Sequence, residues 1–297
     1  MAPEYYTFTG GERVPDRVTH VLIDKALNFV PALSFYEHPN IEEVIIHDGV
    51  EKIEERAFSR CPRLRRVIMP GVKEVEKNAF SAGALSYIEC GKLEIIGKCA
   101  FIHCQSLSSI DLPSAKIVER AAFQRCTNLR NAKFGKDLES IGGSAIGGSA
   151  FYYCKNLERI TLPLKDGIID DVDTFQICKK LNRVDLVGGV HETIAALLME
   201  EWKNDMNEEI DAFNRILPNT SAGKWYDPVE NDPGEKAQAI RAWITSLLRK
   251  IVHYKAEHNR ILNEAAATLQ PALPNDIVLK NIFPFIELPS FTFEGEH

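Results

Sequence analysis

The chain has 297 residues, of which 45% are hydrophobic and 26% charged, and its net charge is -7. This is the composition of a globular protein large enough for one long domain or two unequal ones, and no apolar run approaches the ~20 residues that a membrane helix needs. Neither half has a basic excess, no leader is evident at the start, and there are seven cysteines, so we expect no nucleic-acid partner, no membrane span, and a cytoplasmic or nuclear protein with free thiols.

A recurring phenylalanine organises residues 1–190. An opening strand with Val18, Val21 and Ile23 lies in an N-terminal cap, residues 1–34, and a less regular copy of the repeat begins at Phe35. A phenylalanine that follows a small residue then returns at steps of 22, 21, 22, 28 and 24 residues: Phe58, Phe80, Phe101, Phe123, Phe151 and Phe175. Periods of this length predict stacked coils of about 22 to 24 residues that share one core.

Each coil repeats the same apolar positions around its phenylalanine. A cysteine stands three residues after it in five copies (Cys61, Cys104, Cys126, Cys154, Cys178), with His38 and Gly83 in that slot in two others. The pattern L-x-x-I-x-L follows, as in Leu107, Ile110 and Leu112. A pair with V-x-x-I spacing precedes each phenylalanine. The L-x-x-I-x-L stretch predicts one strand per coil in a parallel sheet, and proline ends several of these strands.

This pattern resembles the BspA-type leucine-rich repeat, a family of bacterial surface proteins and large protist families. The resemblance covers about residues 18–190, because the Phe, Cys and Leu slots recur in phase. It implies an α+β fold: a leucine-rich repeat solenoid with a parallel β-sheet, followed by a helical C-terminal region. The sequence departs from the pattern at Gly83, at Phe134 and Gly135 where Leu-Pro is usual, and at a duplicated pentapeptide.

That pentapeptide is the IGGSA of residues 141–145, which is repeated at 146–150. A phosphate-binding loop would need G-x-x-x-x-G-K-[ST] or G-x-G-x-x-G, and neither string is present. We interpret the duplication as a bulge at the edge of a coil. Ile141 has the correct spacing from Leu138, whereas Ile146 has the correct spacing from Phe151, and removing one IGGSA shortens the 28-residue step to 23.

The cysteine column allows a metal or disulfide interpretation, but zinc sites use ligands paired closely in sequence, whereas these cysteines lie a repeat apart. We expect a ladder of buried, free thiols, with Cys90 and Cys99 off the ladder and unpaired. His253 and His258 are five residues apart on a predicted helix and form no H-E-x-x-H string, so we expect packing or surface roles for them.

Helical periodicity replaces the repeat in the C-terminal region, residues 191–297. We predict helices near 192–217, 235–268 and 275–283, with a Pro- and Gly-rich linker at 218–234. The first two helices should pair antiparallel and cover the open end of the solenoid, because terminal repeats need a cover. The acidic face of the first helix suits solvent. The string LPNDIVLKNIFPFIELPSF weakly resembles an F-box or SOCS-box segment.

No nucleophile, base and orienting acid can be identified together, so we expect no catalytic residue, cofactor or metal site. The outward strand positions mix both charge signs and suit a protein partner. The sequence therefore predicts a non-enzymatic protein-interaction scaffold, with a ubiquitin-ligase-type adaptor or a surface adhesin as alternatives. The predicted contact residues are Arg65, Arg66, Tyr87, Arg130, Lys133, Arg159 and Arg183.

Overall fold

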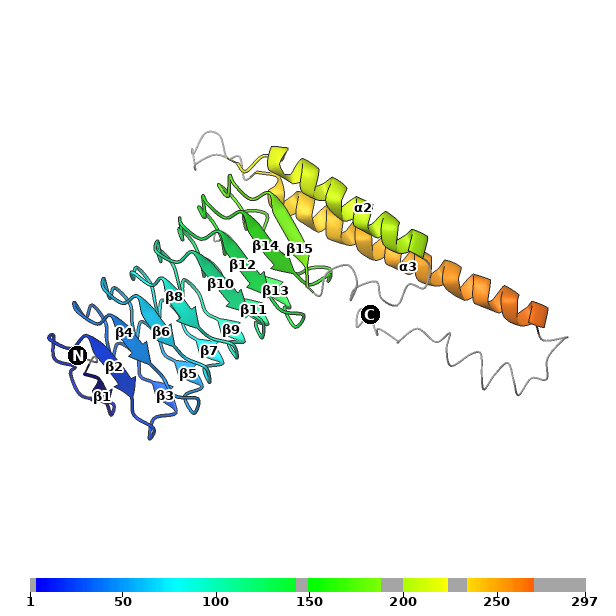
Figure 1. The fold of residues 1–297 in the computed structure, drawn as a ribbon. Coiled ribbons are helices and arrows are strands. Elements are labelled where there is room, and N and C mark those ends of the chain that lie inside the picture. Colours follow the sequence, from blue (N-terminus) through cyan, green and yellow to red (C-terminus); the bar gives the residue numbers. More distant parts are fainter. Residues whose placement is uncertain (1–3, 143–148, 188–199, 224–233, 270–297) are drawn as a thin grey trace.

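A computed structural model of the chain describes residues 4–142, 149–187, 200–223 and 234–269. It confirms the parallel-strand solenoid followed by helices (Figure 1). The predicted strands form two front sheets. The first has the order β1 (Tyr6–Phe8), β2 (His20–Ile23), β4 (Glu43–Ile45), β6 (Arg66–Ile68), β8 (Tyr87–Glu89), and the second has β10 (Ser109–Leu112), β12 (Asn131–Phe134), β14 (Arg159–Leu162), β15 (Arg183–Leu186).

The V-x-x-I pairs form a second parallel ladder, which the sequence did not predict. This six-stranded back sheet consists of β3 (Phe29–Val30), β5 (Lys52–Ile53), β7 (Glu74–Val75), β9 (Ile95–Ile96), β11 (Ile117–Val118) and β13 (Ser140–Ile141). Two residues per coil are too few to show the alternation that identifies a strand. The back sheet is continuous, whereas the front is interrupted between β8 and β10. The interruption coincides with the coil of Phe80, in which the next leucine, Leu85, comes one residue early.

The phenylalanines stack along the solenoid axis, as the repeat predicts. Phe101 and Phe123 are 5.4 Å apart between ring centroids and only 1° from parallel. The stack runs from Phe35 to Phe175, and Phe8, which the repeat pattern did not include, adds a tilted ring 4.7 Å from Phe35. All of these rings are buried. Since truncating a buried phenylalanine to alanine costs about 3 to 5 kcal/mol, the stack is a main source of stability.

The cysteine column is buried and satisfied by the backbone. Each thiol donates to the carbonyl of a phenylalanine in the preceding coil, from Cys61 to Phe35 at 3.0 Å through Cys178 to Phe151 at 3.2 Å. Burial raises the pKa of Cys61, Cys104 and Cys178 to about 12, so these thiols stay protonated. All seven cysteines are free, including Cys90 and Cys99.

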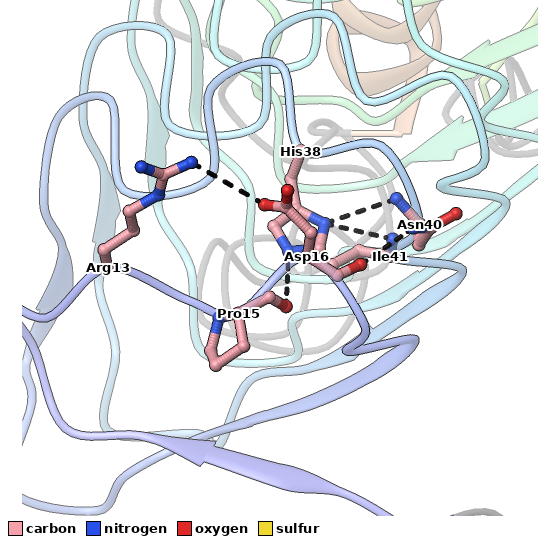
Figure 2. Close-up of polar contacts among 6 residues, drawn as sticks. All are labelled: Arg13, Pro15, Asp16, His38, Asn40 and Ile41. Atoms are coloured by element: carbon pink, nitrogen blue, oxygen red, sulfur yellow. Dashed lines mark hydrogen bonds and ion pairs between the residues drawn. The ribbon is translucent and has the colours of Figure 1, made fainter.

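His38 occupies the cysteine slot of its coil and uses both ring nitrogens (Figure 2). Its Nε2 lies 3.1 Å from the carbonyl oxygen of Pro15, and its Nδ1 accepts the backbone N–H groups of Asn40 and Ile41. Because Nδ1 accepts, Nε2 is the donor, as the thiol is elsewhere. Burial lowers the pKa of His38, which is therefore neutral in this position.

The backbone around each stacked ring forms a turn that we call the Phe turn, comprising the phenylalanine and two residues on either side. The N–H groups of its first, central and last residues donate to carbonyls of the next coil. In the coil of Phe58 the pairs are Arg56 to Lys77 at 3.1 Å, Phe58 to Ala79 at 2.8 Å and Arg60 to Ser81 at 2.7 Å. All three bonds form in the coils of Phe35, Phe58, Phe80 and Phe101, and the central and last bonds form in those of Phe123 and Phe151. A Phe turn therefore has donors toward the C-terminal end of the solenoid and acceptors toward the N-terminal end.

The duplicated pentapeptide is accommodated after the back strand. Ile141 fills a core position: it is fully buried, pairs with Val118 and forms a bridge to Ile169. Residues 143–148 lie outside the described part of the chain. The stacked ring of Phe151 remains 5.3 Å from that of Phe123 despite the longer step.

Two helices cover the C-terminal end, as expected from the need to cap a solenoid. They are α2 (Glu200–Ile216), which continues into the 3-10 turn η1 (Leu217–Asn219), and α3 (Lys236–Leu269). Phe213 stacks on Trp243 at 4.4 Å, and Trp202 stacks on Tyr254 at 5.1 Å, so the helices run antiparallel. The predicted helix near 275–283, the box-like string and residues 192–199 lie outside the described residues.

The helices replace a further coil by mimicking its hydrogen bonds. The side-chain amide of Asn214 accepts the N–H of Val184 in β15 at 2.9 Å and donates to its carbonyl at 3.2 Å. The last Phe turn donates from Ile177 to the carbonyl of Ala222 at 2.6 Å. Buried Lys236 donates to the carbonyls of Leu181 and Leu217, and its burial lowers its pKa.

Candidate protein-binding surface

The registers of the parallel strands align the outward side chains of the front sheets in columns. In the first front sheet, one column contains His20, Glu43, Arg66 and Tyr87, which are direct register partners. A second column, two residues further along each strand, contains Leu22, Ile45, Ile68 and Glu89. Adjacent strands lie about 4.8 Å apart, so the side chains of one column touch their neighbours.

The first column is a connected polar network. The Nε of Arg66 is 3.0 Å from Oε1 of Glu43, and the Tyr5 hydroxyl donates to Oε2 of Glu43 at 2.8 Å. The Arg66 guanidinium lies over the Tyr87 ring, 5.1 Å from its centroid, and this cation–π contact orients both side chains. The hydrogen bond to Glu43, assisted by burial, raises the pKa of Tyr5. Arg65, the residue before this strand, is exposed.

The second column is apolar over three consecutive strands. Leu22 is 38% exposed, and Ile45 and Ile68 are half-buried. Tyr87, which is 49% exposed, lies on the next strand of the same face. An aligned row of aliphatic side chains beside an exposed tyrosine is the kind of apolar centre that protein interfaces use. Ile45 and Ile68 lie between the two inward residues of their L-x-x-I-x-L stretches, so the pattern indicates that they face outward, but it does not show that they align with Leu22.

The second front sheet presents charges that are paired between coils. Lys133 and Asp111 are 3.3 Å apart, Arg159 and Arg183 both contact Asp185, at 3.1 and 2.7 Å, and Arg130 approaches Glu158 at 3.8 Å. The structure therefore places five of the seven predicted contact residues in front strands, with Arg65 and Arg130 directly before β6 and β12. Arg65, Arg66 and Tyr87 are part of the coils of the first front sheet, and the other four lie beyond the interruption.

Among the described residues, no three His, Cys, Asp or Glu side chains are grouped so that they could hold a metal ion. Within the same residues, no helix has both the length and the apolar character needed to cross a membrane.

Comparison with known proteins is consistent with this repeat geometry. The model of the BspA type leucine-rich repeat region matches six copies, over residues 28–149 and 94–198, which together span more than half of the chain. No curated protein matches the chain.

Several solved structures resemble the chain at low identity. A leucine-rich repeat protein from Bacteroides ovatus is 19% identical, with 57% of this chain and 48% of that chain covered and a TM-score of 0.40. The T. pallidum leucine-rich repeat protein is 19% identical, with 62% and 68% covered and a TM-score of 0.36. The pneumococcal vaccine antigen PcpA is 17% identical, with 59% and 38% covered and a TM-score of 0.37.

The matched region thus spans about half of the B. ovatus chain. The family assignment depends on the family model and on the repeating Phe, Cys and Leu positions, and not on these three pairs. With six copies of the repeat in phase over residues 28–198, the chain belongs to the BspA-type leucine-rich repeat family.

Proposed function

We propose that this protein is a non-enzymatic scaffold that binds a protein partner through the outward positions of its front strands. The observation that carries the proposal is the apolar column of Leu22, Ile45 and Ile68 beside exposed Tyr87. Repeat proteins bind partners on extended surfaces of this kind, since the outward positions vary without disturbing the core.

The charges around the apolar column would supply specificity. Arg66 is held by Glu43 and Tyr87, so its guanidinium is already oriented and loses little conformational freedom on binding. On the second front sheet, Arg130, Lys133, Arg159 and Arg183 are paired with carboxylates, so a partner would have to offer comparable acceptors there. We therefore expect the first front sheet to provide most of the binding energy.

Affinity purification of the tagged chain from its native cell, followed by quantitative mass spectrometry, tests this proposal. The front variant is Leu22→Ser/Arg65→Ala/Tyr87→Ser, and a second variant changes Arg130, Lys133, Arg159 and Arg183 to alanine. The matched control is Lys73→Ala/Lys77→Ala/Lys116→Ala, three exposed cations on the coils of the back sheet.

The front variant should recover at least tenfold less of a partner that the control variant still recovers in full. Equal recovery by the front variant and the control would show that the first front sheet is not the binding surface. Loss only in the second variant would move the binding surface to the other front sheet.

We further infer a cytoplasmic or nuclear location, because all seven cysteines are free and free thiols persist in reducing compartments. Cell fractionation tests this, and a secreted pool would instead favour the surface-adhesin alternative. The ubiquitin-ligase alternative depends on a string beyond residue 269, outside the described residues. Co-purification of a cullin-type complex would support that alternative.

A further inference from the structure

The N-terminal end of the Phe-turn ladder has hydrogen-bond acceptors without donors. In the first Phe turn, Leu33, Phe35 and Glu37 donate to the second coil, at 3.1, 2.8 and 2.9 Å. The acceptor positions of this first coil are the carbonyls of Ala32, Ser34 and Tyr36, equivalent to Glu55, Ala57 and Ser59 one coil later. Among the described residues, none of these three carbonyls accepts a hydrogen bond.

Phe8 covers the ring of Phe35 at this end, but residues of the turn that carry these carbonyls are open to solvent. Ala32 and Tyr36 are exposed and Ser34 is half-buried, whereas their counterparts Ala57 and Ser59 are buried beneath the first coil. On the front, β1 adds a strand before β2, but on the back β3 is the terminal strand of its sheet. The loop of Pro15 and Asp16 in Figure 2 contacts His38 and Asn40, beyond the turn itself.

Exposed apolar side chains surround the free carbonyls. Phe29 is 39% exposed, Leu33 54% and Tyr36 37%. The next two coils have polar or charged residues at the equivalent positions: Lys52 and Glu74 for Phe29, Arg56 and Asn78 for Leu33, and Ser59 and Ser81 for Tyr36. Apolar residues return only further along, as at Ile95 and Ile102. A row of bare acceptors bordered by apolar residues has the properties of a sheet edge to which a further polypeptide segment can add.

At the opposite end most of the equivalent groups are already engaged. Asn214 satisfies β15, Ile177 donates its N–H to the carbonyl of Ala222, and Asp173 donates its N–H to the Asp171 carboxylate at 3.0 Å. Within the described residues, a second copy of the chain therefore has no complete row of three free donors to offer at its C-terminal end. If the N-terminal ends of two copies met, carbonyl groups would face carbonyl groups, and no hydrogen bonds could form between them.

We propose that the N-terminal end of the solenoid is a docking edge for an extended segment of another protein, which adds its backbone in the manner of a further Phe turn, while Phe8 keeps the place of the next ring. The segment would donate three backbone N–H groups to Ala32, Ser34 and Tyr36 and pack apolar side chains on Phe29 and Leu33. This continues the pattern by which each coil already holds the next. The edge is distinct from the front-strand surface, so either proposal can fail without the other.

A synthetic peptide of residues 71–83 in which glycine replaces Phe80 is a suitable probe, because Phe8 already occupies the place of a further ring. In the folded protein its Asn78, Phe80 and Ala82 donate the three N–H groups to the next coil, at 3.0, 2.8 and 2.8 Å. Added to the isotope-labelled full chain, it should produce saturable carbonyl carbon shifts at Ala32, Ser34 and Tyr36. The control peptide is N-methylated at the three donating residues and should produce none. Equal shifts with both peptides, or no shift at millimolar peptide, would overturn the proposal.

Peptide affinities of two protein variants, and the oligomeric state of the chain alone, test whether binding occurs at this edge. Leu33→Asp in the protein should weaken peptide binding at least tenfold, because the exposed position tolerates aspartate but loses its apolar contact. Val172→Asp, at a site 37% exposed near the other end, should leave the affinity unchanged. In analytical ultracentrifugation the chain alone should show no association through this edge. A concentration-dependent dimer that Leu33→Asp abolishes would show that the edge serves a second copy instead, and would contradict the proposal.

Discussion

The Phe turn requires backbone conformations that most residues adopt at a cost. The residues two before and two after the phenylalanine have positive φ in nearly every coil: Leu33, Glu37, Arg56, Arg60, Asn78, Ala82, Cys99, His103, Ala121, Arg125, Tyr153 and Ile177. Only Asn78 and His103 in this set are of residue types that favour the left-handed region. The conformation directs alternate N–H groups to the next coil, so the hydrogen bonds it creates compensate for its strain.

Ala82→Gly should therefore stabilise the protein. Ala82 is exposed and has a φ of 56°, so glycine removes the clash of Cβ with its own backbone and sacrifices no packing. Glycine also raises the entropy of the unfolded chain, which offsets part of this gain. We expect the free energy of unfolding to rise by about 0.5 to 1 kcal/mol. Urea denaturation measures it. Ala79→Gly, a buried position three residues away with no positive φ, is the control and should be destabilising.

His38 makes stability dependent on pH in a way that the thiols do not. Burial lowers its pKa below the 6.5 of the free side chain, so the unfolded chain binds the proton more readily. Stability is full above pH 6.5 and falls as the pH decreases from there toward the lower pKa of the folded state. His38→Cys, the residue typical of this column, should flatten the profile between pH 7 and pH 5. The free energy of unfolding of this variant is measured by urea denaturation at each pH. If it still falls between pH 7 and pH 5 as in the original chain, a group other than His38 causes the pH dependence.

Among the elements, those with strong periodic patterns could be predicted from the sequence. The ring stack, the thiol ladder and the front strands followed from Phe101, Cys104 and Ile110 and their equivalents, because each recurs at a fixed offset. Phe8 belongs to the stack but lies 27 residues before Phe35, outside the period. The interruption after β8 has only a one-residue shift as its signal, too small to distinguish from an ordinary turn variation.

The positions of the candidate binding residues were only partly predictable. Alternation along each strand showed that Arg66 and Tyr87 face outward. Their contact with each other, and the apolar row from Leu22 to Ile68, depend on the register between strands, which one strand's sequence does not contain. The strand-like role of Asn214 has no sequence signal at all, because any helix can carry an asparagine.

Asn214→Leu should weaken the attachment of α2 to β15. Leucine has a similar size, but it leaves the buried N–H and carbonyl of Val184 without partners, a loss of about 2 kcal/mol. Hydrogen exchange of the Val184 amide should accelerate while that of Ile110, in the middle of the solenoid, stays slow. Asn204→Leu makes the same exchange at an exposed position of α2 and should change neither rate. If the Val184 amide exchanges at the same rate in both variants, the side chain of Asn214 does not replace the hydrogen bonds of a further strand.

At the scale of the whole molecule, charge alternates from coil to coil along the back sheet. The residues just before successive back strands are Glu51, Lys73, Glu94, Lys116 and Glu139. Lys73 is 2.7 Å from Glu51, and Lys116 is 2.7 Å from Glu94. These contacts raise the pKa of both lysines. At this position each coil therefore attracts the coils directly before and after it. Coils two apart carry charges of the same sign, so contacts between neighbouring coils are favoured over contacts between coils two apart.

Lys73→Glu tests whether this alternation matters to the assembled solenoid. The change places three carboxylates in consecutive coils, so the melting temperature should fall at low ionic strength. The loss should shrink as salt is added, because these side chains are exposed and their interactions are screened. Inverting the whole column, with Glu51→Lys, Lys73→Glu, Glu94→Lys, Lys116→Glu and Glu139→Lys, restores the alternation and should recover most of the melting temperature. If the inverted chain has the same low melting temperature as the single variant, the alternation of charges does not stabilise the solenoid, and the loss in Lys73→Glu comes from side-chain packing at position 73.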